Sequence, residues 1–405
     1  MSKYEELKAR GLIAQTTHES EIKELIDNGK ATFYVGFDPT ADSLHVGHLL
    51  VMIGMKHLQE AGNKVVALIG GGTVMVGDPT GKTDMRRIMD REEIDKNCAR
   101  FKEQLSRFID FSGDKAIMVN NGDWLLNLNY ISFLREVGVY FSVNQMLTAE
   151  CFKTRLARGL SFIEFNYMLM QSYDFYKLHN DYGCNLEVGG NDQWANILGG
   201  VDLVRKMNGE EVYGLTLPLL TTSDGKKMGK TEKGALWLDK EKCSPYDFYQ
   251  YWRNVDDADV LGLIKKFSFK PLTELEVFDK MEGAELNKAK AFLAYEITEL
   301  VHGKEEADKA KAASEAAFGG AASENMPGAE IDAADVDSIT VLDYIAKAKL
   351  VPSKGEGRRL LQQGGLYLNE NRIEELDRIF KADDFTDGSA VLRLGKKKHF
   401  RITIK

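Results

Sequence analysis

A βαβ pattern near the N-terminus is the feature that most constrains the fold of this chain. The apolar run at 32–37 predicts a strand, 46–60 predicts a helix, and the apolar run at 64–69 predicts a second strand. Both strand runs are continuously apolar, which indicates a parallel sheet buried on both faces. Two parallel strands joined by a helix form a right-handed crossover unit.

The same alternation continues through the first 230 residues. It predicts an α/β fold with a doubly wound, Rossmann-like parallel sheet in a first domain at 1–232, with the ligand site at the carboxyl ends of the strands. The further strands are expected at 116–120, 184–188 and 215–220, and the further helices at 94–108, 162–179 and 191–207.

The remaining chain changes character twice. A mainly helical pattern at 233–317 predicts an α-helical domain. The small, acidic and nonperiodic residues at 318–338 predict a flexible linker. Residues 339–405 then predict a small α+β domain. A length of 405 residues, 43% of them hydrophobic, is enough to form two or three separate cores.

Net charge and cysteine content exclude some classes of protein for this chain. The net charge of -9 argues against a basic coat for nonspecific nucleic-acid binding, yet 353–405 carries 12 Lys and Arg against 8 Asp and Glu. A basic tail on an acidic body suggests one RNA-facing module. Four widely spaced cysteines suggest neither a zinc ribbon nor a disulfide framework. No signal peptide or membrane-length apolar run is evident, so we expect a cytoplasmic protein without a membrane partner.

Two histidines mark the start of the first predicted helix, in Thr40-Ala-Asp-Ser-Leu-His45-Val-Gly-His48. A spacing of three places both imidazoles on one helix face, and the helix N-terminus offers unpaired N–H groups to an anion. Gly47 would let a nucleotide approach the backbone. Histidines at this spacing also bind zinc, but no third ligand is evident, and the preceding Asp38-Pro-Thr40 turn favours an anion. The motif therefore predicts a site for ATP phosphates.

A second glycine-containing segment, Gly77-Asp-Pro-Thr-Gly81-Lys82-Thr83, ends like a P-loop. The spacing excludes that motif, because a Walker sequence needs glycine five residues before Gly81 and Val76 stands there. An ordinary surface turn remains the alternative for Lys82 and for Arg86 close by.

Polar residues also interrupt apolar elements further along. Tyr167, Gln171 and Asp174 share one face of an apolar, aromatic helix, where they either satisfy one another or bind a polar ligand. Gly189-Gly190-Asn191-Asp192-Gln193-Trp194 joins a predicted strand to a predicted helix, at the edge where open α/β sheets bind ligands. A helix N-cap is the alternative role of Asp192.

Lys227-Met228-Gly229-Lys230-Thr231 is a small-residue loop with two lysines. Lysine clusters usually lie on solvated turns. Such a loop also suits closure over a polyphosphate, where lysines stabilise charge developing on departing pyrophosphate.

The histidine motif and the lysine loop together resemble the signature pair of class I aminoacyl-tRNA synthetases. The first is similar to their "HIGH" motif, and the second to their "KMSKS" loop, with Gly229 in place of its first serine and Thr231 in place of its last. The remaining motifs, which follow the family order over nearly the whole chain, resemble bacterial tyrosyl-tRNA synthetases. One departure is Asn191, where that family usually has serine.

The resemblance implies that the chain activates L-tyrosine with ATP and transfers it to tRNA(Tyr). Magnesium would arrive with ATP, no zinc would be needed, and Tyr34 and Asp174 would bond the substrate phenol, so that Asp174 decides the identity of the amino acid. The implied catalytic residues are Thr40, His45, His48, Lys82, Arg86, Lys227 and Lys230. The implied tyrosine-binding residues are Tyr34, Asp78, Tyr167, Gln171, Asp174 and Gln193, and the implied ATP-binding residues are Gly36, Asp38, Gly47, Gly190, Asp192 and Lys230.

The resemblance also implies partners. Family members are homodimers, and 124–145 resembles their interface. The tail resembles an RNA-binding module shared with a ribosomal small-subunit protein, whose helix would present cationic side chains to RNA phosphates. The implied tRNA-binding residues are Arg205, Lys206, Lys354, Arg358 and Arg359.

Two other functional classes remain open. A small-molecule adenylyltransferase shares the His-x-Gly-His element, but it would lack the lysine loop, the helical domain and the tail. A noncatalytic RNA-binding paralogue could keep the fold, but it should have lost some of Asp78, Asp174, Gln193, Lys227 and Lys230, all of which are present.

Overall fold

The computed structural model describes residues 1–80, 89–157, 159–231, 234–318, 326–395 and 398–405. The described chain divides into two compact units. The first comprises 1–239 and 261–277, and the second comprises 240–260 and 278–405. No described helix is long and apolar enough to cross a membrane.

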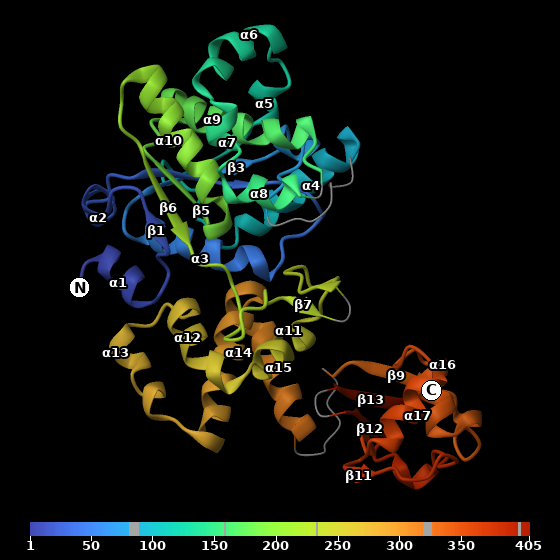
Figure 1. Cartoon of the computed structure of the whole chain (residues 1–405). Coiled ribbons are helices and arrows are strands. Elements are labelled where there is room, and N and C mark those ends of the chain that lie inside the picture. Colours follow the sequence, from blue (N-terminus) through green and yellow to red (C-terminus); the bar gives the residue numbers. More distant parts are fainter. Residues whose placement is uncertain (81–88, 158, 232–233, 319–325, 396–397) are drawn as a thin grey trace. The chain divides into compact units, whose positions relative to one another are not determined.

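A six-stranded sheet forms the core of the first unit (Figure 1). Its order is β1-β6-β5-β2-β3-β4, and all neighbours are parallel except β1, which pairs antiparallel with β6 at the edge. The chain runs outward from β2 through β3 to β4, and from β5 to β6 on the other side. The strand order therefore reverses between β2 and β5, where open sheets of this type bind ligands. The strands are β1 (Gln15–Thr16), β2 (Thr32–Phe37), β3 (Lys64–Ile69), β4 (Ala116–Asn120), β5 (Leu186–Gly190) and β6 (Tyr213–Leu217).

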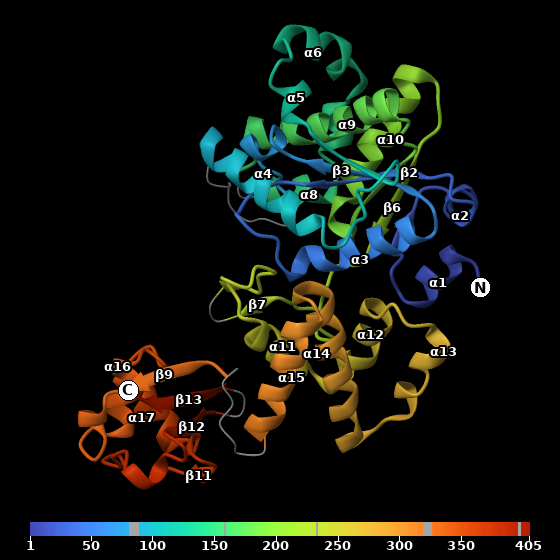
Figure 2. The same cartoon turned by 180° about the vertical axis from the view of Figure 1, so that it is seen from behind.

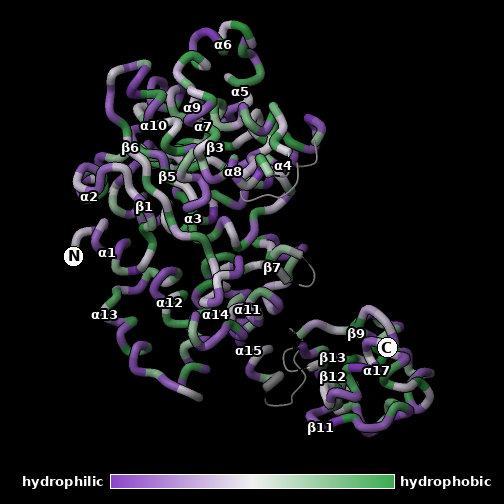
Figure 3. The backbone as a smooth tube through the Cα atoms, viewed as in Figure 1, coloured by the Kyte–Doolittle hydropathy of each residue, from purple (hydrophilic) through white to green (hydrophobic). Residues whose placement is uncertain are grey.

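Helices cover both faces of this sheet. In both views, α3 lies on one face, and α9 and α10 lie on the other (Figures 1 and 2). Apolar stretches gather in the strands and in α3 (Figure 3), as burial on two faces requires. The helices of this unit are α1 (Lys3–Ala9), α2 (Glu19–Asp27), α3 (Val46–Glu60), α4 (Arg91–Leu105), α5 (Gly122–Leu125), α6 (Tyr130–Glu136), α7 (Val143–Met146), α8 (Glu150–Leu156), α9 (Phe162–Tyr182), α10 (Trp194–Asn208), α13 (Leu272–Leu275) and most of α12 (Asp257–Phe267).

Local sequence signals explain where the longest helix begins and ends. Ser161 and Glu164 form a reciprocal capping box at the start of α9, and Gly183, in the left-handed conformation, ends it. Four expected elements, at 32–37, 46–60, 64–69 and 116–120, have the observed bounds. Strand β6 was expected at 215–220 but stops at Leu217, because Pro218 has no N–H to donate to the ladder.

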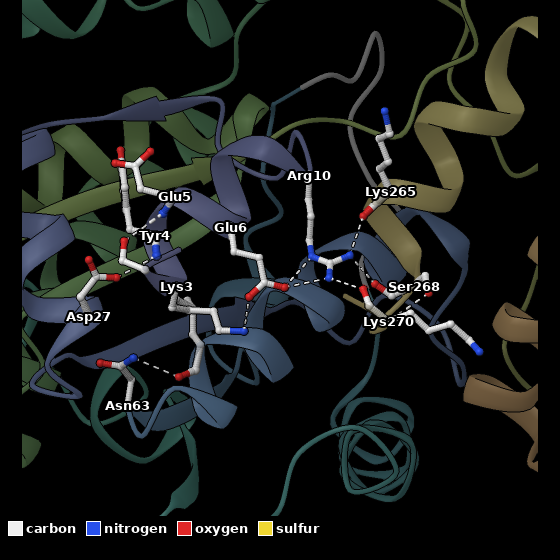
Figure 4. Close-up of polar contacts among 12 residues, drawn as sticks. Lys3, Tyr4, Glu5, Glu6, Arg10, Asp27, Asn63, Lys265, Ser268 and Lys270 are labelled. Atoms are coloured by element: carbon white, nitrogen blue, oxygen red, sulfur yellow. Dashed lines mark hydrogen bonds and ion pairs between the residues drawn. The ribbon is translucent and has the colours of Figure 1, made fainter. Parts of the chain in front are cut away.

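A buried arginine joins the N-terminal helix to the segment that follows α12 (Figure 4). Arg10 is 2% exposed, and its guanidinium donates to the carbonyl oxygens of Ser268 at 2.7 Å and Lys270 at 2.6 Å. It also pairs with the Glu6 carboxylate at 2.7 Å. This charge is therefore buried with its donors satisfied, and its bonds hold 261–277 against the N-terminal part of the first unit.

The second unit contains a helical part and an α+β part. Its helices are α11 (Pro245–Arg253), α14 (Leu286–His302), α15 (Lys304–Phe318), α16 (Val341–Lys347) and α17 (Lys354–Gln362). Its five-stranded sheet has the order β11-β10-β12-β13-β9. The strands are β9 (Gly328–Ile331), β10 (Leu366–Leu368), β11 (Asn371–Arg372), β12 (Ser389–Leu394) and β13 (Lys398–Ile404).

Strand β9 differs from the expectation for its segment. It lies inside 318–338, where the composition predicted a flexible linker, and it pairs in parallel with β13. Ile331 is buried in the core of this sheet, which stabilises the short strand. Small and acidic neighbours conceal this single apolar contribution in the sequence.

Candidate active site

A cavity of about 630 Å³ lies in the first unit, at the carboxyl ends of β2 and β5. Its position agrees with the switch point of the sheet. Fifteen of the residues singled out from the sequence line it, namely Tyr34, Gly36, Asp38, Thr40, His45, Gly47, His48, Asp78, Tyr167, Gln171, Asp174, Gly190, Asp192, Gln193 and Lys227.

The two histidines are held by reciprocal bonds at the start of α3. Nδ1 of His45 accepts from the Gly47 amide at 3.0 Å, and Nδ1 of His48 accepts from the His45 amide at 3.2 Å. The ring centroids are 4.0 Å apart. Because each Nδ1 acts as an acceptor, a neutral imidazole here carries its hydrogen on Nε2 and can donate it to an anion.

This geometry corrects one expectation for α3. The helix N-terminus was expected to offer unpaired N–H groups, but the amides of Val46, Gly47 and His48 bond to the Leu236 carbonyl, His45 Nδ1 and the His45 carbonyl. A Cβ on Gly47 would lie 2.7 Å from Cε1 of His45, so this glycine makes room for the histidine ring. The donors for an anion are therefore side chains rather than these three amides.

Two buried amides on α4 hold the loop that leads to His45. Oε1 of Gln104 accepts from the Leu44 amide at 2.7 Å, and Nδ2 of Asn97 donates to the Pro39 carbonyl at 3.0 Å. Neither residue was expected from the sequence. Their spacing of seven, which places them on one face of a charged helix, was the available signal.

The lysine loop lies beside the histidine motif, although about 180 residues separate them in the chain. The segment after the loop pairs with the segment before α3, since the Val46 amide donates to the Leu236 carbonyl and the Leu238 amide donates to the Leu44 carbonyl. Gly229 has φ +83°, and a Cβ there would lie 3.1 Å from Cγ1 of Val46. Glycine at this position of the motif therefore fits the backbone and the close packing.

Asp174 occupies the buried part of the cavity wall. It is 1% exposed, and its carboxylate accepts from Nε1 of Trp124 at 2.7 Å and from Nδ2 of Asn121 at 2.8 Å. Burial raises the pKa of Asp174 well above its usual range, while these two donors oppose the shift. No role in the pocket was predicted for Asn121 or Trp124, because both belong to the start of α5, whereas Asp174 lies on α9.

Hydrogen bonds connect the other polar residues of the wall in pairs. The Tyr167 hydroxyl donates to Asp38 at 2.9 Å, and Nε2 of Gln193 donates to Asp78 at 2.8 Å. Nε2 of Gln171 donates at 3.0 Å to Glu187, a residue that the sequence analysis did not single out.

Four buried polar atoms of the wall make no hydrogen bond with the described residues. They are the Tyr34 hydroxyl, Oγ1 of Thr80, Oε1 of Gln171 and Oε2 of Glu187. Buried polar atoms in native proteins are usually paired, so a cavity with several unpaired atoms suits a polar ligand.

One described lysine, Lys227, lies at the outer part of the cavity. Nζ of Lys227 lies 3.9 Å from Oδ2 of Asp192, and the Lys227 side chain is 53% exposed. The backbone of Lys230 and Thr231 forms the short strand β7, which pairs with β8 (Gly234–Ala235). The Lys230 side chain, Lys82 and Arg86 lie outside what the structure describes.

The residues expected to contact tRNA do not line this cavity. Arg205 and Lys206 stand at the end of α10, where both pair with Asp202 at 2.6 Å. In the second unit, Lys354 pairs with Asp343, and Arg359 pairs with Glu356 at 3.0 Å. Among the described residues, no group of three or more His, Cys, Asp or Glu side chains is arranged to hold a metal ion.

Two family models match the chain. The model described as "tRNA synthetases class I (W and Y)" matches residues 27–319, and the model described as "Tyrosine--tRNA ligase SYY-like C-terminal domain" matches 320–402. Named relatives are similar over the full length. The tyrosine–tRNA ligase of Acetivibrio thermocellus is 60% identical and covers 100% of this chain and 99% of its own. That of Clostridium botulinum strain Hall is 58% identical, with 99% of each chain covered.

Solved structures have the same fold. A C-terminally truncated mitochondrial tyrosyl-tRNA synthetase of Aspergillus nidulans superposes with a TM-score of 0.70 at 31% identity, covering 78% of this chain and 94% of its own. The Archaeoglobus fulgidus tyrosyl-tRNA synthetase complexed with L-tyrosine superposes with a TM-score of 0.59 at 18% identity, covering 76% and 100%.

Proposed function

The chain belongs to the class I tRNA synthetases of the tryptophan and tyrosine group, and from this membership we propose that it is a tyrosine–tRNA ligase. It activates L-tyrosine with ATP to tyrosyl-adenylate and pyrophosphate, and then transfers the tyrosyl group to the 3′-terminal ribose of tRNA(Tyr). The observation that carries the choice of tyrosine is the buried pair of Tyr34 and Asp174 in the cavity wall.

A phenol complements this pair. Asp174 has two donors of its own, and its remaining lone pairs can accept from a substrate hydroxyl. The unpaired Tyr34 hydroxyl can donate to the same substrate oxygen. Phenylalanine would bury these groups without a partner, which costs about 1–3 kcal/mol per group. The unpaired Oε1 of Gln171, together with Asp78 and Tyr167, supports a place for the substrate ammonium.

Positioning and electrostatics carry the chemistry of activation. The tyrosine carboxylate attacks the α-phosphate of ATP, and pyrophosphate departs, so no protein nucleophile is needed. Nε2–H groups of His45 and His48, with Thr40, donate to phosphate oxygens, and Lys227 and Lys230 stabilise the departing pyrophosphate. Lys82 and Arg86 would act beside it. Gly36, Asp38, Gly47, Gly190 and Asp192 would hold the nucleotide, and Gln193 the tyrosine carboxylate.

Magnesium enters as part of the ATP substrate. Two acidic residues of the cavity are already engaged, since Asp38 accepts from Thr73 and Tyr167, and Asp78 accepts from Gln193 and the Thr80 amide. These contacts favour a metal carried by the phosphates over a cage of protein carboxylates.

The same proposal extends to domains and partners. The catalytic domain is 1–232, the helical domain 233–317, the connecting segment 318–338 and the RNA-binding domain 339–405. Arg205, Lys206, Lys354, Arg358 and Arg359 contact tRNA, and the protein works in the cytoplasm, where its substrates are. Exposed apolar residues support a homodimer that buries 124–145, among them Ile131 at 62% and Val139 at 69% exposure.

Transfer of labelled tyrosine to tRNA tests this function. With ATP and bacterial tRNA, we expect acid-precipitable label that mild alkali releases, since the product is an ester. Labelled phenylalanine and tryptophan serve as controls. Equal charging by tyrosine and phenylalanine, or no charging at all, would contradict the proposal.

A further inference from the structure

A second carboxyl group lies in the wall of the amino-acid pocket. Glu187 on β5 is 2% exposed and lines the cavity. Its Oε1 accepts from Nε2 of Gln171 at 3.0 Å, whereas its Oε2 is buried without a hydrogen bond to the described residues. A buried carboxyl group with one oxygen that lacks a hydrogen-bond partner is unusual, because burial without a partner costs free energy.

The sheet places Glu187 directly beside Tyr34. The two residues are partners in the parallel register of β2 and β5, so their side chains project on the same face of the sheet. Both are buried, and the Tyr34 hydroxyl is another of the unpaired polar atoms of the wall. Burial first, and then the Glu187 charge, raise the pKa of Tyr34 well above its usual range, so Tyr34 keeps its hydrogen.

The remaining neighbours of Glu187 come from three other places. Helix α9 contributes Gln171 and the Asp174 carboxylate, whose pKa the Glu187 charge helps to raise. Cys184, just before β5, stays a thiol because burial and Glu187 raise its pKa. On α10, Gly200 leaves room for the carboxyl, since a Cβ there would lie 3.1 Å from Oε2.

Burial raises the pKa of Glu187 to about 7, although Gln171 and Tyr34 both favour the charged form. Burial raises the pKa of both carboxyl groups, but Asp174 has two N–H donors and Glu187 has one, so the hydrogen-bond geometry favours a single negative charge on Asp174. A proton is better placed on Glu187.

We propose that Glu187 is a positioning residue of the tyrosine pocket, which in its protonated form donates to the Tyr34 hydroxyl oxygen and so directs the Tyr34 hydrogen to the substrate phenol. The inference rests on the proposed function. The chain of donors runs from Glu187 through Tyr34 to the phenol oxygen, and the phenol hydrogen then points to Asp174. Deprotonated Glu187 would accept from Tyr34 instead and withdraw that hydrogen from the substrate.

This arrangement makes tyrosine binding sensitive to pH. The directing bond is present below the Glu187 pKa of about 7 and is lost as the pH rises through it. Loss of one donated hydrogen bond predicts a rise of roughly three- to tenfold in the KM for tyrosine between pH 6 and pH 8.5, with a smaller change in kcat.

Glu187→Gln provides the test, because an amide can accept from Gln171 through its oxygen and donate to Tyr34 through its nitrogen at every pH. The KM for tyrosine is measured against pH by tyrosine-dependent pyrophosphate exchange in wild type, E187Q and E211Q, the last a control at an exposed glutamate. We expect the rise in wild type and E211Q and a level KM in E187Q.

Two outcomes would overturn the inference. One is a level KM in wild type, and the other is an equal rise in wild type and E187Q; both can occur while tyrosine still supports exchange. Equilibrium dialysis of tyrosine at pH 6 and pH 8.5 separates binding from turnover. Absence of tyrosine-dependent exchange at every pH would refute the proposed function, and this inference with it.

Discussion

Burial and hydrogen bonding act in opposite directions on Asp174. The protein interior disfavours its charge, and the donors Asn121 and Trp124 favour it. A carboxylate held in this way can recognise a hydroxyl group, because a ligand without one leaves it less well paired. The proposed selectivity for tyrosine therefore depends, at the residue scale, on Asp174 and on two donors, Asn121 and Trp124, that no motif of the sequence identified.

Asp174→Ala should reduce the preference for tyrosine over phenylalanine. Removal of a bond between a hydroxyl and a charged group predicts a fall of roughly ten- to hundredfold in the ratio of the two kcat/KM values. Pyrophosphate exchange with each amino acid measures the ratio. An unchanged ratio would place phenol recognition elsewhere.

Lys227→Ala should slow adenylate formation with little change in tyrosine affinity, since its ammonium meets the outer part of the cavity near Asp192. Loss of charge stabilisation in the transition state predicts a reduction on the order of 100-fold in rate. Single-turnover kinetics measure the rate, and equilibrium dialysis measures the affinity. Lys226→Ala is the matched control, because Lys226 is 82% exposed, pairs with Asp224 and does not line the cavity. Weaker tyrosine binding at an unchanged rate would refute this role.

At the scale of elements, helix α4 determines the shape of the loop before His45. Gln104 and Asn97 are buried on α4, and each bonds the backbone of that loop. These two side chains of one helix therefore stabilise a segment that belongs to no helix or strand.

Gln104→Leu should lower kcat for adenylate formation by roughly tenfold, because the Leu44 amide loses its partner and His45 follows directly. The KM for tyrosine should change much less, since the proposed tyrosine contacts lie elsewhere in the cavity. Steady-state exchange kinetics separate the two constants, and Lys102→Ala, exposed on the same helix, is the control. An equal effect of both substitutions would refute the role of Gln104.

Helix α3 contains a buried histidine that must stay neutral. His57 stacks on Phe269 with ring centroids 4.3 Å apart, and neither ring nitrogen bonds to the described residues. Burial, with the nearby Arg10 charge, lowers the pKa of His57 to about 3. The unfolded chain takes up this proton below about pH 6.5, so the contribution to stability is present above that pH and is lost as the pH falls towards 3.

His57→Phe should remove this part of the acid sensitivity. Between pH 7 and pH 5, wild type should lose about 2 kcal/mol more of its free energy of unfolding than the variant does. Urea denaturation followed by tryptophan fluorescence measures the difference. Identical losses in the two proteins would show that His57 is protonated in the folded state.

At the scale of the whole molecule, the sequence predicts the succession of helices and strands better than the contacts between distant segments. The pattern of apolar residues gave the correct bounds for the elements at 32–37, 46–60, 64–69 and 116–120, because buried strands are short apolar runs and the helix is a longer segment. The predicted end of β6 was wrong, because Pro218 ends the strand. Strand β9 was not predicted, because it pairs with a strand about 70 residues later in the chain.

In the candidate site, too, local motifs could be predicted and contacts between distant segments could not. Motifs that lie within a few residues of one another identified the histidines, the lysine loop and the helix of Tyr167, Gln171 and Asp174. Glu187 was not predicted, because only the register of β2 and β5 places it beside Tyr34. The donors at the start of α3 were misjudged, because their partners include Leu236, far along the chain.

Amino-acid-dependent exchange of labelled pyrophosphate into ATP tests the central claim most directly. The reaction is measured without tRNA, with tyrosine, phenylalanine, tryptophan or no amino acid. We expect rapid exchange with tyrosine alone, since the pocket of Tyr34 and Asp174 selects the phenol of tyrosine and the cavity promotes attack of the tyrosine carboxylate on ATP. Exchange that does not require tyrosine, or no exchange with any amino acid, would contradict the account.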